Sequence, residues 1–88
     1  ANLWAFVPIP EGMKATHVNI FDKNNTAFEV FEVQINDHTA VSKGTGNCNT
    51  KQAITNVEST LYNSLAIEVD ITTVNDRIRG GLVTIIPI

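Results

Sequence analysis

Few side chains in this sequence could carry chemistry, and their spacing does not favour catalysis. The chain of 88 residues has two histidines, one cysteine and nine acidic residues. Asp37 and His38 are neighbours in a turn and could form an acid–base pair, while Cys48 could be a nucleophile. Adjacent turn residues point apart, however, and no cation or histidine lies near Cys48 in the sequence to lower its pKa. We expect no catalytic residues.

The same scarcity makes a metal or a cofactor unexpected. No histidine or cysteine spacing matches a zinc motif. Asp70, Asn75 and Asp76 bracket one turn, but calcium takes about six to eight oxygen ligands. The segment Gly44-Thr45-Gly46 is shorter than a phosphate-binding loop and lacks its Lys-Ser/Thr ending. We therefore expect a protein that holds no metal and no cofactor.

Composition indicates one globular domain over residues 1–88, with 43% hydrophobic and 17% charged residues. The formal charge of -3 has the wrong sign for a phosphate backbone, so we expect no nucleic-acid partner. The apolar stretch Leu3–Ile9 is far shorter than the ~20 residues of a spanning helix, so we expect no membrane partner. No basic head typical of a signal peptide precedes it. The free Cys48 is consistent with assembly in a reducing compartment.

Abundant β-branched and aromatic residues, cut by turn residues about every ten positions, predict an all-β chain. The expected fold is a single small antiparallel β-sandwich of jelly-roll or immunoglobulin-like type, with about seven strands. A further strand or one helical turn could occupy Val57–Leu61. The predicted strands are Leu3–Val7, Lys14–Phe21, Ala27–Ile35, Ala40–Lys43, Gln52–Asn56, Ser64–Ile71 and Arg77–Ile86.

The first and last strands are unusual because both of their faces are apolar, at Leu3–Val7 and Leu82–Ile86. A sandwich of this size has one interior, so we expect a neighbouring subunit or another protein to cover the second face, unless these are central strands under loops. The predicted interface residues are Leu3, Trp4, Phe6, Val7, Val83, Ile85, Ile86 and Ile88.

Two patterns predict how the remaining strands are arranged. The segment Ser64–Ile71 alternates cleanly, and a hairpin with the last strand would pair Asp70 with Arg77 and Glu68 with Arg79. These cross-strand charge pairs would fix the register.

In the third strand the apolar phase changes between Val30 and Phe31. The change predicts a β-bulge that moves the inward set of side chains from even to odd positions. The alternative leaves Phe28 on the surface, where a partner could bind it.

Several motifs of this chain resemble those of small β-rich structural proteins of tailed bacteriophages, of the marine and cyanobacterial type. The first is Trp4–Val18, in which an aromatic strand is followed by Pro-Ile-Pro-Glu-Gly and Lys-Ala-Thr. The likeness continues in Val41–Asn47, Asp70–Thr72 and Asp76–Ile85, over most of the chain. The Asn-Cys-Asn at residues 47–49 departs from the plainer turn of those proteins.

The resemblance implies a non-enzymatic virion protein: a capsid decoration or cement protein, or a fibre-associated module. Its expected partners are copies of itself, as a homotrimer or another homo-oligomer, and the major capsid protein or another virion protein. Assembly in the host cytoplasm and a place on the outer surface of the capsid would follow. The alternative is a lectin-like carbohydrate-binding or adhesion module using Trp4 or Tyr62, which an exposed aromatic ring beside Asn and Asp would favour.

Overall fold

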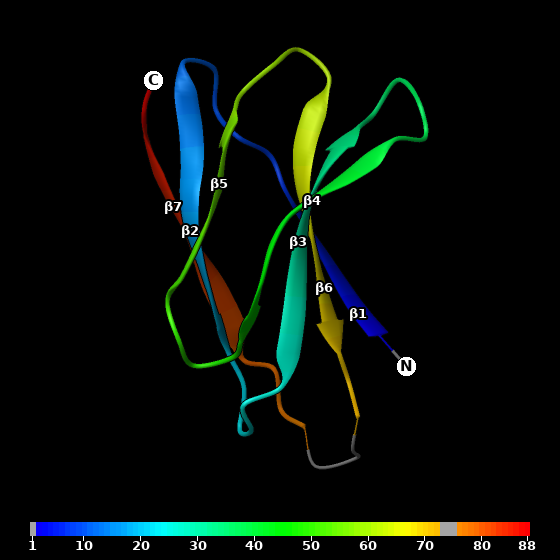
Figure 1. The fold of residues 1–88 in the computed structure, drawn as a ribbon, viewed down its shortest axis with the longest axis vertical. Helices are drawn as coiled ribbons and strands as arrows, with labels where there is room; N and C mark the ends of the chain where they lie inside the picture. Colours follow the sequence, from blue (N-terminus) through cyan, green and yellow to red (C-terminus); the bar gives the residue numbers. More distant parts are fainter. Residues whose placement is uncertain (1, 73–75) are drawn as a thin grey trace.

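The computed structural model describes residues 2–72 and 76–88, which form two antiparallel sheets packed as a sandwich (Figure 1). Its seven strands confirm the predicted all-β class. These two ranges contain no helix that could cross a membrane. The strands are β1 Asn2–Val7, β2 Met13–Phe21, β3 Ala27–Gln34, β4 Ala40–Asn47, β5 Gln52–Glu58, β6 Asn63–Asp70 and β7 Gly80–Pro87.

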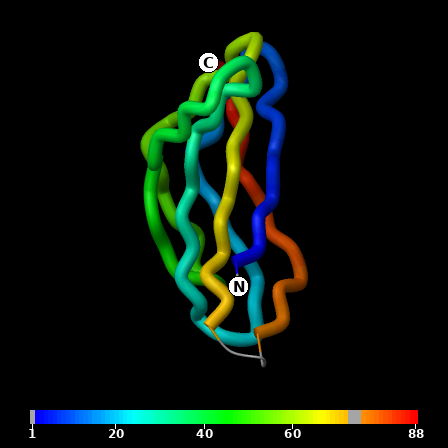
Figure 2. The backbone as a smooth tube through the Cα atoms, turned by 90° about the vertical axis from the view of Figure 1, so that its right-hand side faces the viewer, coloured from blue at the N-terminus to red at the C-terminus, as the bar shows by residue number. Residues whose placement is uncertain are grey.

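The strands are ordered β1-β6-β3-β4 in one sheet and β5-β2-β7 in the other. The immunoglobulin constant-type arrangement has the same central pairs, β2 with β5 and β3 with β6. Three strands differ from that arrangement, since β1 lies beside β6, β4 lies beside β3 and β7 lies beside β2. In Figure 2, β4 and β5 close one side of the sandwich, whereas β1 and β7 are the edges of the opposite side. We call this opposite side the open side.

The core forms where the alternating apolar side chains of the two sheets meet. As the sequence pattern predicts, Leu65, Ile67 and Val69 of β6 are buried. From the other sheet Val18 and Ile20 of β2 are buried as well. Each such burial contributes about 1.5 to 3 kcal/mol. The full cluster of buried residues is Ile9, Ala15, Val18, Ile20, Phe28, Val30, Cys48, Ile54, Val57, Leu65, Ile67 and Val69.

The predicted hairpin between the last two strands is wrong, because β6 and β7 belong to different sheets. Glu68 lies opposite Trp4 on one side and Glu29 on the other, so its register partner is not Arg79. Asp70 pairs with Asn2, and its register partner is not Arg77.

Strand β7 pairs with β2, and β6 already has β3 on one side and β1 on the other. No edge of β6 is therefore left to pair with β7. The calcium candidate Asn75 lies outside the described residues.

The predicted bulge exists, but it lies in β4 and not in β3. Val30 pairs with Gly44 and Phe31 pairs with Ser42, so the extra residue is Lys43. Against β6, strand β3 runs without a register shift. The even-numbered side chains of β3 therefore face the interior along the whole strand. The apolar residues lie on this inner face up to Val30 and on the outer face from Phe31 onward. Phe28 is buried, so the alternative of a surface Phe28 is wrong too.

Three boundaries differ by more than one residue from the sequence-based expectation. Strand β4 continues to Asn47 because its glycines let it pack closely: a Cβ at Gly46 would lie 2.9 Å from Cζ of Phe28. Strand β5 continues to Glu58, which accounts for the first part of Val57–Leu61 as strand. Strand β7 begins only at Gly80.

A buried carboxylate joins three segments at the end of the sandwich where β2 ends. Asp22 is 7% exposed. Its Oδ2 accepts a hydrogen bond from Oγ1 of Thr26 at 2.7 Å, and its Oδ1 accepts one from the backbone N–H of Arg77 at 2.7 Å. The N–H of Asp22 donates to Oδ1 of Asn49 at 3.2 Å. One side chain thereby ties the β2–β3 turn to the segment that leads into β7.

Replacing this carboxylate should destabilise the fold. We expect Asp22→Ala to lower the free energy of unfolding by about 1.5 to 3 kcal/mol, because it removes the acceptor of the buried Thr26 hydroxyl and of the partly buried N–H of Arg77. Asp37→Ala is the matched control, since Asp37 also accepts two hydrogen bonds, from the N–H and the hydroxyl of Thr39, but is fully exposed. Urea denaturation should show a far smaller loss for Asp37→Ala. Equal losses would contradict the role of burial.

Candidate functional site

The side chains considered for catalysis are not brought together. Asp37 and His38 lie in the exposed turn between β3 and β4. The hydroxyl and the backbone N–H of Thr39 donate to Oδ1 of Asp37, at 2.6 and 2.7 Å, and lower the pKa of its carboxyl. Cys48 follows the opposite end of β4. A turn at one end of the strand and a thiol at the other provide no shared site.

Cys48 is a core residue and not part of a flexible loop. It is fully buried within the hydrophobic cluster. Burial raises the pKa of its thiol, and the negative charges of Asp22 and Asp76 raise it further. A protonated, enclosed thiol is a poor nucleophile.

No metal site is evident in the described ranges, which contain no group of three or more His, Cys, Asp or Glu placed to hold an ion. Asp76 instead accepts a hydrogen bond from Nδ2 of Asn24 at 2.8 Å, and its Oδ1 lies 3.0 Å from Oγ1 of Thr26, whose single proton is shared between Asp22 and Asp76. His17 shares a contact of 2.9 Å with the hydroxyl of Thr16 on β2. These polar groups hold turns and strands in place.

The strongest candidate site is a cluster of aromatic rings on the outer face of the four-stranded sheet. Trp4 is 50% exposed and Phe6 is 67% exposed. Their rings stack with centroids 6.4 Å apart and planes inclined by 14°. Phe31 lies 5.9 Å from Trp4 at an angle of 36°. A shallow hollow, which we call the aromatic face, is lined by Trp4, Phe6, Phe31, Val33, Ala40 and Ala66.

The aromatic face follows from the patterns of β1 and β3. Alternation on β1 puts Trp4 and Phe6 on the outside. The phase change of β3 puts Phe31 outside as well, next to Ala66 of β6, which in turn lies opposite Phe6. The sequence-based prediction of interface residues included Trp4 and Phe6 of β1 but not Phe31. The change of apolar phase in β3 was the signal that could have placed Phe31 on the outer face.

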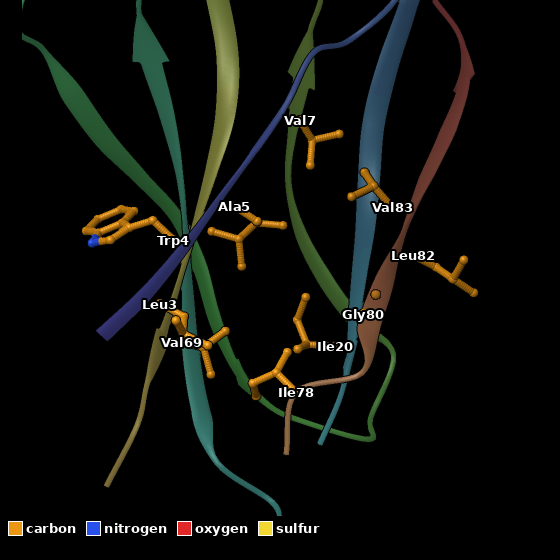
Figure 3. Close-up of a pocket in the computed structure, with 12 residues that line it drawn as sticks. Leu3, Trp4, Ala5, Val7, Ile20, Val69, Ile78, Gly80, Leu82 and Val83 are labelled. Carbon is orange, nitrogen blue, oxygen red and sulfur yellow. The ribbon is translucent and has the colours of Figure 1, made fainter. Parts of the chain in front are cut away.

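A second feature is an apolar cleft between the edges of the two sheets on the open side. Its volume is about 280 Å³. In Figure 3, Ala5, Ile20 and Val83 point into the cleft, whereas Trp4 and Leu82 point outward on opposite sides. We call this feature the edge cleft; its lining is Leu3, Trp4, Ala5, Val7, Ile20, Ile67, Val69, Ile78, Gly80, Gly81, Leu82 and Val83.

The predicted interface residues of β7 divide between its two faces. Val83 and Ile85 lie opposite the buried Val18 and Ala15, so they face the interior and are half-buried. The exposed apolar residues of this strand are Leu82 and Ile86, at 64% and 41%. Leu82 was not among the predicted interface residues.

A separate exposed apolar group lies at the far end of the molecule. Ile35, Leu61 and Tyr62 are exposed there, and the N–H of Ile35 donates to the carbonyl of Tyr62 at 2.7 Å. Ile88 is anchored at the same end by a backbone hydrogen bond to Gly12. Tyr62 therefore does not belong to the aromatic face.

No protein-family model, curated protein or solved structure matches the chain.

The buried thiol gives a direct test of the core. We expect Cys48 to react with a thiol reagent such as DTNB at least about a hundredfold more slowly than an exposed thiol, because reaction requires local opening. Ala53→Cys, which places a thiol at an exposed position of β5, is the internal comparison. Fast reaction of both thiols would show that Cys48 is accessible.

The raised pKa of Cys48 also predicts the direction in which stability changes with pH. Because the folded-state pKa exceeds that of the unfolded chain, the protonated thiol favours folding below the unfolded pKa, and this contribution is lost as pH rises through the folded pKa. Between neutral and strongly alkaline pH, the native chain should therefore lose more stability than Cys48→Ala.

Proposed function

We propose that this chain is a non-enzymatic structural protein of a virus particle, a decoration or cement protein on the capsid of a tailed bacteriophage. The observation that carries the proposal is the aromatic face. Trp4 and Phe6 are half or more exposed and stack on each other, with Phe31 tilted against Trp4, on a surface that no described part of the chain covers. The resemblance of Trp4–Val18 to small phage structural proteins supports the same role.

The chemistry of this surface suits assembly. Protein interfaces are enriched in aromatic residues and depleted of charge at their centres, and a few buried aromatic side chains supply most of the binding free energy. Monomeric proteins rarely expose large contiguous apolar patches. The aromatic face and the exposed Leu82 and Ile86 lie on the two outer surfaces beside the open side. Subunits that share such surfaces would stabilise a shell by burying them.

The proposed partners are further copies of the chain and the major capsid protein or another virion protein. The formal charge of -3 favours the outer surface of the head over contact with the packaged genome. Such a role fits assembly in the host cytoplasm, where a free cysteine is tolerated.

Binding to empty capsids tests the proposal. Empty heads assembled from the major capsid protein of the same genome should bind the chain in a sedimentation assay. We expect Phe6→Asp to weaken binding about tenfold or more, since a central aromatic contact contributes about 2 kcal/mol or more. The matched control is Leu61→Asp, at a side chain that is 82% exposed but lies at the far end.

Circular dichroism should show that both variants stay folded. Failure of the native chain to bind the heads would overturn the proposed function. Equal binding by Phe6→Asp and the native chain would remove the aromatic face as the contact.

One observation favours a second function, carbohydrate binding. Trp4 is exposed next to polar groups on the same face: Glu68 lies opposite it, and Nδ2 of Asn2 donates to Oε2 of Glu68 at 2.5 Å. An aromatic ring flanked by carboxylate and amide groups is suited to stacking against a sugar ring and bonding its hydroxyls.

The tryptophan is a built-in reporter of sugar binding, since the chain contains only one. If this second function holds, titration with a panel of neutral and acidic oligosaccharides should change the emission of Trp4 in a saturable way. Glu68→Gln should weaken the response, whereas Glu11→Gln, in the turn before β2, should not. A flat response to every sugar contradicts this function.

A further inference from the structure

The two edges on the open side contain fewer of the features that normally keep sheet edges from pairing. Natural edge strands are protected by charged residues, prolines or bulges. Neither β1 nor β7 contains a charged residue. On the closed side, β4 carries the bulge at Lys43 and β5 carries Glu58. Charged residues and a bulge in the edge strands are therefore confined to the closed side.

Of the two uncharged edges, β1 is the better template for pairing. Strand β7 contains Pro87, which has no N–H to donate, and begins with Gly80 and Gly81. The six residues of β1 include neither proline nor glycine. Strand β1 pairs on one side only, with β6, so its other edge presents unpaired backbone groups.

We propose that β1 pairs antiparallel with β1 of a second copy, about a two-fold axis at Ala5, so that the two four-stranded sheets become one continuous sheet. The inference rests on the proposed function as a self-assembling structural protein, and it names the contact between copies. The edge cleft, open beside β1 in a single copy, would then face the equivalent cleft of the second copy.

The sequence of β1 is self-complementary in this register. Directly opposite residues of an antiparallel pair point to the same face. With Ala5 on the axis, Trp4 lies opposite Phe6 of the second copy on the outer face, and Leu3 lies opposite Val7 of the second copy on the inner face. Aromatic side chains meet aromatic ones, aliphatic meet aliphatic, and the smallest side chain occupies the axis. The aromatic faces of the two copies would form one row.

The charge distribution also suits a second copy of the same chain. A two-fold contact brings every charge near the axis close to its own copy, so such contacts require an uncharged centre. Strand β1 satisfies this condition. The nearest acidic residue along the sheet, Glu68 on β6, would be separated from its copy by three strand spacings, roughly 14 Å. That distance exceeds the Debye length of about 8 Å at physiological ionic strength.

Disulfide cross-linking at the axis tests the pairing. In an antiparallel pair the two copies of residue 5 have Cα atoms about 4.5 to 5.5 Å apart, which is within the range a disulfide spans. In a Cys48→Ala background, we expect Ala5→Cys to form a covalent dimer under mild oxidation. The matched control is Ala53→Cys, an alanine replaced at an exposed position of β5, an edge of the closed side, and it should form no covalent dimer.

A charge placed at the axis provides a second, non-covalent test. Light scattering should give the mass of a dimer or of a larger assembly of dimers for the native chain. We expect Ala5→Lys to lower it to that of a monomer with unchanged circular dichroism, because two lysines would meet at the axis. Ala53→Lys should keep the native mass.

The outcomes separate this inference from the proposed function. A native chain that is monomeric at high concentration, or that cross-links equally through Ala5→Cys and Ala53→Cys, overturns the β1 pairing, even if it binds capsids. A chain that dimerises through β1 but does not bind capsids upholds the pairing and overturns the capsid role.

Discussion

The whole structure depends on one constraint: a sandwich of two sheets has a single interior, so each strand can bury only one of its faces. Strand β6 meets the constraint fully. Leu65, Ile67 and Val69 fill the interior, and β1 and β3 flank the strand on both sides. The opposing sheet contributes Val18 and Ile20. The chain has few such residues, and no covalent or metal cross-link is evident among those described, so this packing supplies most of its stability.

The same constraint explains the exposed aromatic rings. Strands β1 and β3 contain more apolar side chains than one interior can accept, so the surplus lies on the outside. On β3, Phe28 and Val30 occupy the inner face, and Phe31 lies outside because the strand keeps its register against β6. The aromatic face is thus a direct product of the apolar phase change, and no described part of a single copy covers it.

Sequence reasoning succeeded where the information is local and failed where it depends on which strands meet. The alternation of β6 and the number of strands are local properties, and both were predicted. The pairing of Glu68 with Arg79 assumed that consecutive strands form a hairpin. In the structure, β6 pairs instead with β3 and with β1, which comes from the other end of the chain. The apolar phase change was visible, but only the partner strand shows that the extra residue is Lys43. The β1 part of the candidate site was predictable; Phe31 and Leu82 required the sheet order.

The unequal protection of the edges determines what kind of assembly the fold permits. On the closed side, Lys43 both forms the bulge and makes an ion pair with Glu32 at 3.5 Å, so this edge is irregular and charged and resists further pairing. A sheet with two open edges can grow without limit, as fibres do. A sheet with one protected and one open edge can add a single neighbour, and contact through the same edge of both copies closes the assembly at once. With an unprotected β1 at one edge of the sheet and a protected β4 at the other, the fold therefore favours a closed assembly over an open-ended aggregate.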